Sequence, residues 1–190
     1  MELTTSRLKF LLSGIFLIAL FGVSFWLSRF LTDNETVQNL VNSYGYFAAL
    51  LVGVIAGFNF IVPLPAIAFM PVFLAAHLNA FVLAILLAIG MTVADGVEYA
   101  VSKSGWETLK SSRTSSIRNR LDRWKRKHPV LPIAALFFYT AFAPAPNELS
   151  LPLFASLGYK TMTIMATTLP ANALFNIVYG IGLTAVFHML

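Results

Sequence analysis

The sequence predicts an all-helical integral membrane protein. Three observations support this: 58% of the 190 residues are hydrophobic, only 11% are charged, and apolar stretches of helical length recur along the chain. Soluble domains carry about 25% charged residues. A mean hydropathy of +0.77 agrees with a chain that keeps most of its length in lipid. We therefore expect a single membrane domain over residues 1–190.

The first apolar stretch, Phe10 to Phe30, is long enough to cross about 30 Å of hydrocarbon. It follows the basic residues Arg7 and Lys9. A signal peptide is the competing interpretation, but the apolar run is long for one and no small-x-small cleavage site follows it. We therefore expect residues 1–44 to form an uncleaved N-terminal transmembrane anchor and a polar linker.

A re-entrant helical hairpin is expected next. The apolar stretch 45–57 is too short to span a bilayer and runs into Pro63-Leu-Pro65. Prolines lack an N–H donor and push the residues before them out of the helical region, so the helix should break there. A second short apolar stretch, 66–78, completes the hairpin. One proline-kinked spanning helix is the alternative.

A full span over residues 80–102 completes the first repeat, 45–102, and leads into a basic loop over residues 103–128. This loop holds nine of the thirteen Lys and Arg residues. The apolar segments on both sides favour a cytoplasmic membrane loop over a nucleic-acid site. The pattern within the loop suits either a helix on an anionic membrane surface or a solvated loop. Its apolar residues at mostly helical spacing are Trp106, Leu109, Ile117, Leu121 and Trp124.

The second repeat, residues 129–190, has the same order of segments. A short apolar stretch, 131–142, meets the sequence Pro144-Ala-Pro146. Another short stretch, 149–159, follows. We expect a second re-entrant hairpin, followed by a final transmembrane helix from Thr161 to Val186.

An offset of 81 residues relates the two repeats. Basic residues place the N-terminus and the 103–128 loop in the cytoplasm, so the repeats are expected to have inverted topology. Inverted repeats with broken helices at mid-membrane are typical of transporters, with the substrate site between the breaks. The pairs in register are Pro63 and Pro144, Pro65 and Pro146, Pro71 and Pro152, Phe73 and Phe154, Asp95 and Asn176, and Val97 and Val178.

Asp95 is the first candidate for a proton or substrate pathway, because ionisable groups inside a membrane are costly and usually face a cavity. Burial favours the neutral acid and makes proton exchange near neutral pH feasible. Tyr99, four residues on, shares its helix face, and Glu98 lies close to the cytoplasmic end. A structural hydrogen bond from Asp95 to the hairpin is the alternative.

Glu148 is the second candidate, since it stands at the expected start of a half-helix, where free N–H groups stabilise a carboxylate. It could equally be a helix cap. Four asparagines could line the same cavity: Asn59, Asn147, Asn172 and Asn176. The sequence has no metal-ligand spacing and no nucleophile with base and oxyanion stabiliser, so we expect neither an enzyme nor a bound cofactor or metal.

The pattern resembles the DedA superfamily, also called the VTT or SNARE-associated Golgi protein family, over about residues 45 to 182. The resemblance rests on three stretches: Pro63-Leu-Pro65, Asp95-Gly-Val-Glu-Tyr99 with Lys103 and Gly105, and Phe142-Ala-Pro144-Ala-Pro-Asn147 leading to Leu157-Gly158. It implies two facing re-entrant hairpins and the flipping or scrambling of lipids or a lipid-linked phosphate, with a proton-motive requirement.

Some positions depart from the family pattern. Ile67 replaces an acidic residue, Ala141 and Asn147 replace two arginines, and Ala94 replaces a glycine. The expected partners are membrane lipids and protons, with a homo-oligomer left open and no nucleic acid. The expected location is multi-pass in the cell membrane, the inner membrane if the source is bacterial. A non-transporting scaffold and a small-solute exporter of another inverted-repeat family are the alternatives.

Overall fold

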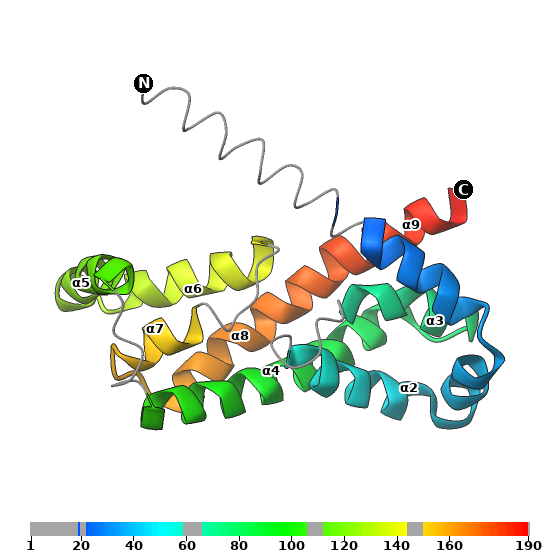
Figure 1. Ribbon diagram of the computed structural model, residues 1–190, viewed down its shortest axis with the longest axis horizontal. Coiled ribbons are helices and arrows are strands. Elements are labelled where there is room, and N and C mark those ends of the chain that lie inside the picture. Colours follow the sequence, from blue (N-terminus) through cyan, green and yellow to red (C-terminus); the bar gives the residue numbers. More distant parts are fainter. Residues whose placement is uncertain (1–18, 20–21, 59–65, 106–111, 144–149, 190) are drawn as a thin grey trace, which may run out of the picture.

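The computed structural model describes residues 19, 22–58, 66–105, 112–143 and 150–189, and this part of the chain is helical without any strand (Figure 1). A helix over residues 22–32 comes first. The following elements are α2 (Glu35–Gly57), η1 (Ala66–Phe69), α3 (Met70–Ala75), α4 (Ala80–Gly105), α5 (Ser112–Lys127), α6 (Val130–Phe142), α7 (Leu151–Ala155), α8 (Thr161–Phe175), η4 (Asn176–Gly180) and α9 (Ile181–Met189).

Among the described residues, three helices are long and apolar enough to cross a membrane: Glu35–Gly57, Ala80–Ser104 and Thr161–Ala185. The all-helical membrane class is therefore supported, and the last two helices match the expected spans 80–102 and 161–186. Most of the expected first span, 10–30, lies outside the described residues.

Helix α2 differs from the short helix expected over residues 45–57. It begins at Glu35, where the Asn34 side chain accepts a hydrogen bond from the Val37 N–H at 3.1 Å. Gly45 then kinks it, with φ 50° and ψ −121°. This break separates residues 35–44 from residues 46–57, so the expected short helix begins at the kink, and a further helical piece that starts at Glu35 precedes it. By length and composition the whole of α2 could cross a bilayer, although its course is not straight.

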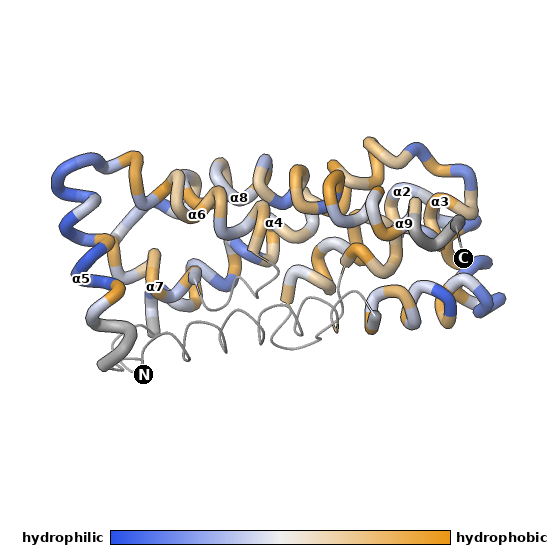
Figure 2. Tube along the Cα trace, turned by 90° about the horizontal axis from the view of Figure 1, so that it is seen from above, coloured by the Kyte–Doolittle hydropathy of each residue, from blue (hydrophilic) through white to orange (hydrophobic). Residues whose placement is uncertain are grey.

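Part of the basic loop forms a helix, α5, at one end of the molecule. Figure 2 shows that α5 is largely hydrophilic, whereas the long helices beside it are largely hydrophobic. Of the residues expected on its apolar face, Leu121 is buried, while Ile117 and Trp124 are exposed. Trp106 and Leu109 lie outside the described residues.

The 81-residue spacing recurs in the secondary structure. Helix α3 begins at Met70 and α7 at Leu151, while α4 begins at Ala80 and α8 at Thr161. Each short helix is followed by a residue in the left-handed backbone region, and the two residues stand 81 positions apart. These two residues are His77, with φ 60°, and Gly158, with φ 70°.

Two of the hydrophobic clusters in the described part of the chain also correspond at this spacing. One cluster packs α3 against the start of α4, and the other packs α7 against the start of α8. Their corresponding buried residues are Met70 and Leu151, Phe73 and Phe154, and Leu83 and Ile164. Thus each short helix covers the beginning of the long helix that follows it.

Helices α4 and α8 pack side by side and run in opposite directions. Tyr99, near the end of α4, lies in the same cluster as Ile164, near the start of α8. Leu121 of α5 belongs to this cluster too. The end of α4 and the start of α8 therefore meet beside the basic helix.

Tyrosine hydroxyls join the ends of the two segments that contain the proline pairs. The Asn79 N–H donates to the Tyr46 hydroxyl at 3.0 Å, so residues 46 and 79 lie together. The Tyr159 hydroxyl donates to the Pro129 carbonyl at 2.9 Å, so residues 129 and 159 also lie together. The two ends of each segment therefore lie close to each other.

Candidate functional site

A polar cluster lies between α4 and α8, in the middle of two otherwise apolar helices. Thr92 and Asp95 come from α4, and Asn172 and Asn176 come from α8 and the turn that follows it. All four are buried, with at most 4% of each residue exposed. Polar groups are rarely buried so deeply unless they bond to one another.

The Asn172 side chain holds this cluster together. Its amide Nδ2 donates to the Asp95 carboxyl Oδ2 at 2.9 Å and to the Thr92 hydroxyl at 3.2 Å. The Asn176 amide donates to the Asn172 carbonyl at 2.9 Å and reaches the Met91 sulfur at 3.4 Å. These bonds join α4 to α8 across the interface.

The contacts between the two helices are reciprocal at the 81-residue spacing. Asn172 stands 81 residues after Met91, and Asn176 stands 81 residues after Asp95. Asp95 pairs with Asn172, and Met91 contacts Asn176. Asp95 thus meets the counterpart of Met91, and Met91 meets the counterpart of Asp95. Such reciprocal contacts are the pattern that a two-fold axis produces.

The backbone beside this cluster departs from an ordinary α-helix. Pro170 lies inside α8, and residues Asn176–Gly180 form a π-helical turn. Proline removes an N–H donor from the helix, and single π turns are frequent at functional sites. Among the described residues, the buried side-chain oxygen of Asn176 has no hydrogen-bond donor. The cluster therefore retains an acceptor for a proton donor or a cation.

Residues that flank the two proline pairs lie close to the cluster, although the prolines themselves do not belong to the described part. Gly57 and Ala66, on either side of residues 59–65, both lie against Met91. The carbonyl of Phe142, just before residues 144–149, accepts a bond from the Tyr179 hydroxyl at 3.0 Å. Tyr179 belongs to the same π turn as Asn176.

The structure brings together only some of the residues expected at the site. Asp95 and Asn176 line the cluster, and Glu98 is half-buried one turn further along α4. Tyr99 is buried, and its hydroxyl donates to the Tyr159 carbonyl at 2.7 Å. The remaining expected residues lie outside the described part of the chain: Asn59, Pro63, Pro65, Pro144, Pro146, Asn147 and Glu148.

Tyr159 connects several elements at the α5 end. Its carbonyl accepts from Tyr99 and its hydroxyl donates to Pro129. Burial raises the pKa of the Tyr159 phenol above its ordinary value, so the hydroxyl keeps the proton that it donates. These contacts fix the turn between α7 and α8.

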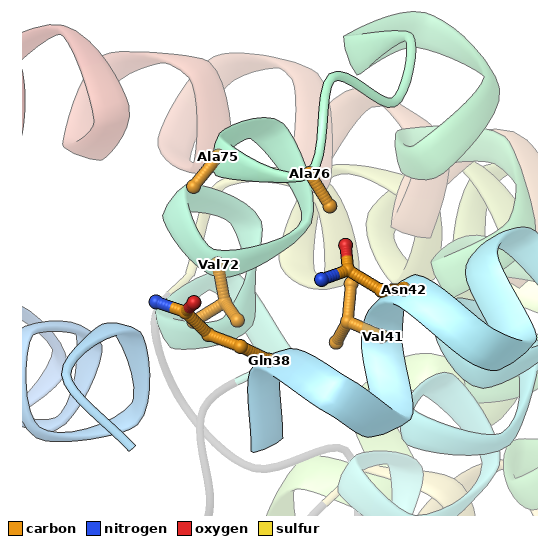
Figure 3. A pocket seen from close by; sticks show the side chains of 6 residues that line it. All are labelled: Gln38, Val41, Asn42, Val72, Ala75 and Ala76. Carbon is orange, nitrogen blue, oxygen red and sulfur yellow. The ribbon is translucent and has the colours of Figure 1, made fainter. Parts of the chain in front are cut away.

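A small pocket of about 120 Å³ lies elsewhere, between the first part of α2 and the end of α3. Figure 3 shows Gln38 and Asn42 reaching from α2 toward Val72, Ala75 and Ala76. The amide side chains of Gln38 and Asn42, one helical turn apart, line this pocket and were not predicted from the sequence.

Sequence reasoning also missed Met91 and Thr92 as members of the cluster. The 81-residue offset could have pointed to Met91, because its counterpart in the second repeat is Asn172, which was already a candidate. Thr92 gave no signal, since a threonine in an apolar helix usually bonds its own backbone.

The described residues hold no group of three His, Asp or Glu side chains that could bind a metal ion. No family model, curated protein or solved structure matches the chain.

Proposed function

We propose that the chain is a membrane transporter of the DedA type that moves a lipid or a lipid-linked phosphate across the bilayer, coupled to proton exchange at Asp95. The observation that carries the proposal is the buried, reciprocal pairing of Asp95 with Asn172 and of Met91 with Asn176. A buried acid between two transmembrane helices is a functional candidate by default.

The same pairing supports an inverted repeat. The two helices that contribute it begin 81 residues apart, at Ala80 and Thr161, and run in opposite directions. Equivalent helices in opposite orientation are what a two-fold axis in the membrane plane produces. With the basic loop in the cytoplasm, the N-terminus is cytoplasmic and the protein is multi-pass.

Two observations support re-entrant hairpins. Each proline-containing segment is closed at its base by a tyrosine, and residues flanking the prolines lie beside the central cluster. The part of α2 after the Gly45 kink, residues 46–57, is about 18 Å long. That length reaches roughly the middle of a hydrocarbon core of about 30 Å.

Proton exchange at Asp95 would change the bonding between the two repeats. The charged carboxylate accepts strongly from Asn172, and the neutral acid can also donate. The Asn176 oxygen, on the π turn one helical turn away from Asn172, is an acceptor without a described donor. Loading a proton would therefore favour a different packing of α4 against α8.

Purified protein in vesicles tests the proposal. Movement of a fluorescent lipid between leaflets is measured with and without a pH gradient, for wild type and for Asp95→Asn and Glu148→Gln. We expect faster lipid movement than in empty vesicles and an altered pH profile for Asp95→Asn. Asp122→Asn is the control, because this carboxylate lies on α5 in an exposed ion pair.

Two results would overturn parts of this proposal. Wild-type protein that leaves the lipid distribution unchanged would favour a non-transporting scaffold. Lipid movement with identical pH profiles for wild type and both site variants would rule out proton coupling through Asp95 and Glu148.

Single cysteines test the topology, because the chain has no native cysteine. Labels are introduced at positions 61–67 and 142–149 and probed with impermeant reagents from each side. Re-entrant hairpins predict that each tip reacts from its own side only. A stretch that reacts from neither side, with its flanking segments on opposite sides, would mean a continuous crossing helix.

A further inference from the structure

The outer face of the basic helix α5 has no role in the proposed transport site. Helix α5, Ser112–Lys127, carries seven Lys or Arg residues and one acidic residue, Asp122. So much positive charge on one short helix needs a partner or bulk water. The structure shows which side of the helix faces the protein and which side faces away.

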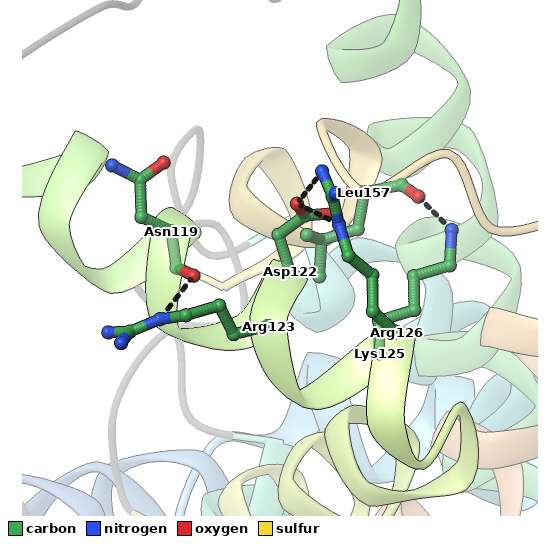
Figure 4. Close-up of polar contacts among 6 residues, drawn as sticks. All are labelled: Asn119, Asp122, Arg123, Lys125, Arg126 and Leu157. Atoms are coloured by element: carbon green, nitrogen blue, oxygen red, sulfur yellow. Dashed lines mark hydrogen bonds and ion pairs between the residues drawn. The ribbon is translucent and has the colours of Figure 1, made fainter.

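The inner side of α5 is fixed to the bundle by two residues. Leu121 is buried in the cluster that contains Tyr99 and Ile164. The Lys125 ammonium donates to the Leu157 carbonyl (Figure 4) and lies 4.7 Å from the centre of the Tyr159 ring. The helix therefore has a defined orientation, anchored on the turn that precedes α8.

The outer side carries four of the other basic residues. Arg120, Arg123, Arg126 and Lys127 are exposed. Arg126 pairs with Asp122 at 2.9 Å, as Figure 4 shows, but this pair is itself largely exposed and contributes little. In the described chain no carboxylate pairs with the other three cations.

A tryptophan stands among these cations. Trp124 is 38% exposed, and it shares one helix face with Arg120 and Lys127, at spacings of four and three residues. Tryptophan is enriched at the boundary between membrane and water, where its ring lies among the headgroups. Helices with basic and aromatic residues on the exposed side typically bind anionic membrane surfaces.

The position of α5 favours a bilayer over other anionic partners. It lies between the end of α4 and the start of α6, and α4 is long and apolar enough to span. Lys103, in the last turn of α4, adds a further exposed cation. A helix connected to spans in this way stays within reach of the headgroups, where Lys and Arg side chains are attracted to anionic lipid.

We infer that the outer face of α5, formed by Arg120, Arg123, Trp124, Arg126 and Lys127, binds the headgroups of anionic lipids. This inference requires insertion in a membrane but does not depend on transport. Since Lys125 holds the turn before α8, bound lipid would also hold the start of that helix in place.

Fluorescence of Trp124 in lipid nanodiscs tests the inference. Trp26 and Trp106 are replaced by phenylalanine, which leaves one tryptophan. We expect headgroup-proximal brominated phosphatidylglycerol to quench its emission more than brominated phosphatidylcholine does, with the difference lost at high salt. The variant with glutamine at positions 120, 123, 126 and 127 should lose the phosphatidylglycerol-dependent quenching.

Lys160→Gln is the matched control, because Lys160 is an exposed cation at the start of α8 but not on α5. It should keep the full phosphatidylglycerol-dependent quenching. Equal quenching of Trp124 by both lipids at low salt would overturn the inference. If the glutamine variant does not fold, the salt titration of the protein that keeps all its basic residues still tests the inference. Binding of a short RNA without any lipid preference would also overturn it.

Discussion

The first half of the molecule (α2, α3 and α4) and the second half (α6, α7 and α8) share the 81-residue spacing at the starts of α3 and α7 and of α4 and α8, but they pack their helices differently. In the first half, α2 and α4 meet backbone to backbone: a Cβ on Gly53 would lie 2.5 Å from the Leu87 carbonyl oxygen, and one on Gly90 would lie 2.5 Å from the Leu50 carbonyl oxygen. In the second half, alanines stand at the positions 81 residues later, 134 and 171.

The long helices differ in the same sense. Helix α4 continues for 26 residues without a break. Its counterpart α8 contains Pro170 and passes into a π turn at Asn176–Gly180. Close glycine packing holds helices tightly together, whereas proline and π turns are sites where helices bend. The comparison indicates a tight contact between α2 and α4 and a more deformable α8, with the polar cluster between α4 and α8.

The largest expected effect is at the glycine contact. Gly90→Ala should lower the free energy of unfolding by about 1–3 kcal/mol or more, because its Cβ would overlap the α2 backbone. Gly182→Ala is the control, because its Cβ meets nothing within 4 Å and alanine favours helix by up to about 1 kcal/mol. Thermal unfolding in detergent measures both. Equal stability of the two variants would contradict the tight α2–α4 contact.

The next effect concerns the two contacts between α4 and α8, in which Asp95 bonds to Asn172 and Met91 contacts Asn176. Asn172→Met removes the amide that bonds Asp95 and Thr92, which should cost about 1–3 kcal/mol because a buried acid loses a donor. Met91→Leu, at the corresponding position, should cost less than about 1.5 kcal/mol. Adding Asp95→Leu to Asn172→Met should restore part of the loss, and a further loss in the double variant would contradict the pairing.

A smaller effect is expected at the two left-handed residues. Gly158→Ala should cost about 1–2 kcal/mol, because φ is 70° and the added Cβ is strained by its own backbone. His77→Gly should leave stability unchanged or raise it by less than about 1 kcal/mol, because relief of strain offsets the entropy of glycine. Chemical unfolding followed by circular dichroism measures both changes. A Gly158→Ala variant as stable as wild type, or a clearly destabilised His77→Gly variant, would contradict the correspondence.

The smallest effect is at the starts of the long helices. The Asn79 side chain accepts from the Phe81 and Val82 N–H groups and caps α4, so Asn79→Ala should cost about 1 kcal/mol. Lys160 precedes α8 and its side chain makes no capping bond, so Lys160→Ala should stay within about 0.5 kcal/mol. Unfolding midpoints of the two variants, measured side by side, check the difference.

Much of the helical order could be predicted from hydropathy. The spans 80–102 and 161–186 were predicted because each is a long apolar run, and the structure has candidate spans at Ala80–Ser104 and Thr161–Ala185. The helical turns before Gly45 could not be predicted from hydropathy, because polar and apolar residues alternate irregularly over residues 35–44, and the helix start is marked only by the Asn34 cap.

The candidate site was predicted in part. Asp95 drew attention because an acid in an apolar span is costly. Its partner could not be chosen among four asparagines, since pairing depends on how α4 crosses α8. Tyr99 shares the helix face of Asp95 in sequence, yet its longer side chain reaches the Tyr159 carbonyl instead.

The sequence by itself determined the helical membrane class, the placement of nine of thirteen cations in one loop and the 81-residue spacing of the prolines, because these depend only on composition and order along the chain. Tertiary structure alone decided that Asp95 meets Asn172 while Met91 meets Asn176, and that Lys125 holds the turn before α8. Contacts between residues so distant in sequence depend on the crossing of packed helices, which no local pattern specifies.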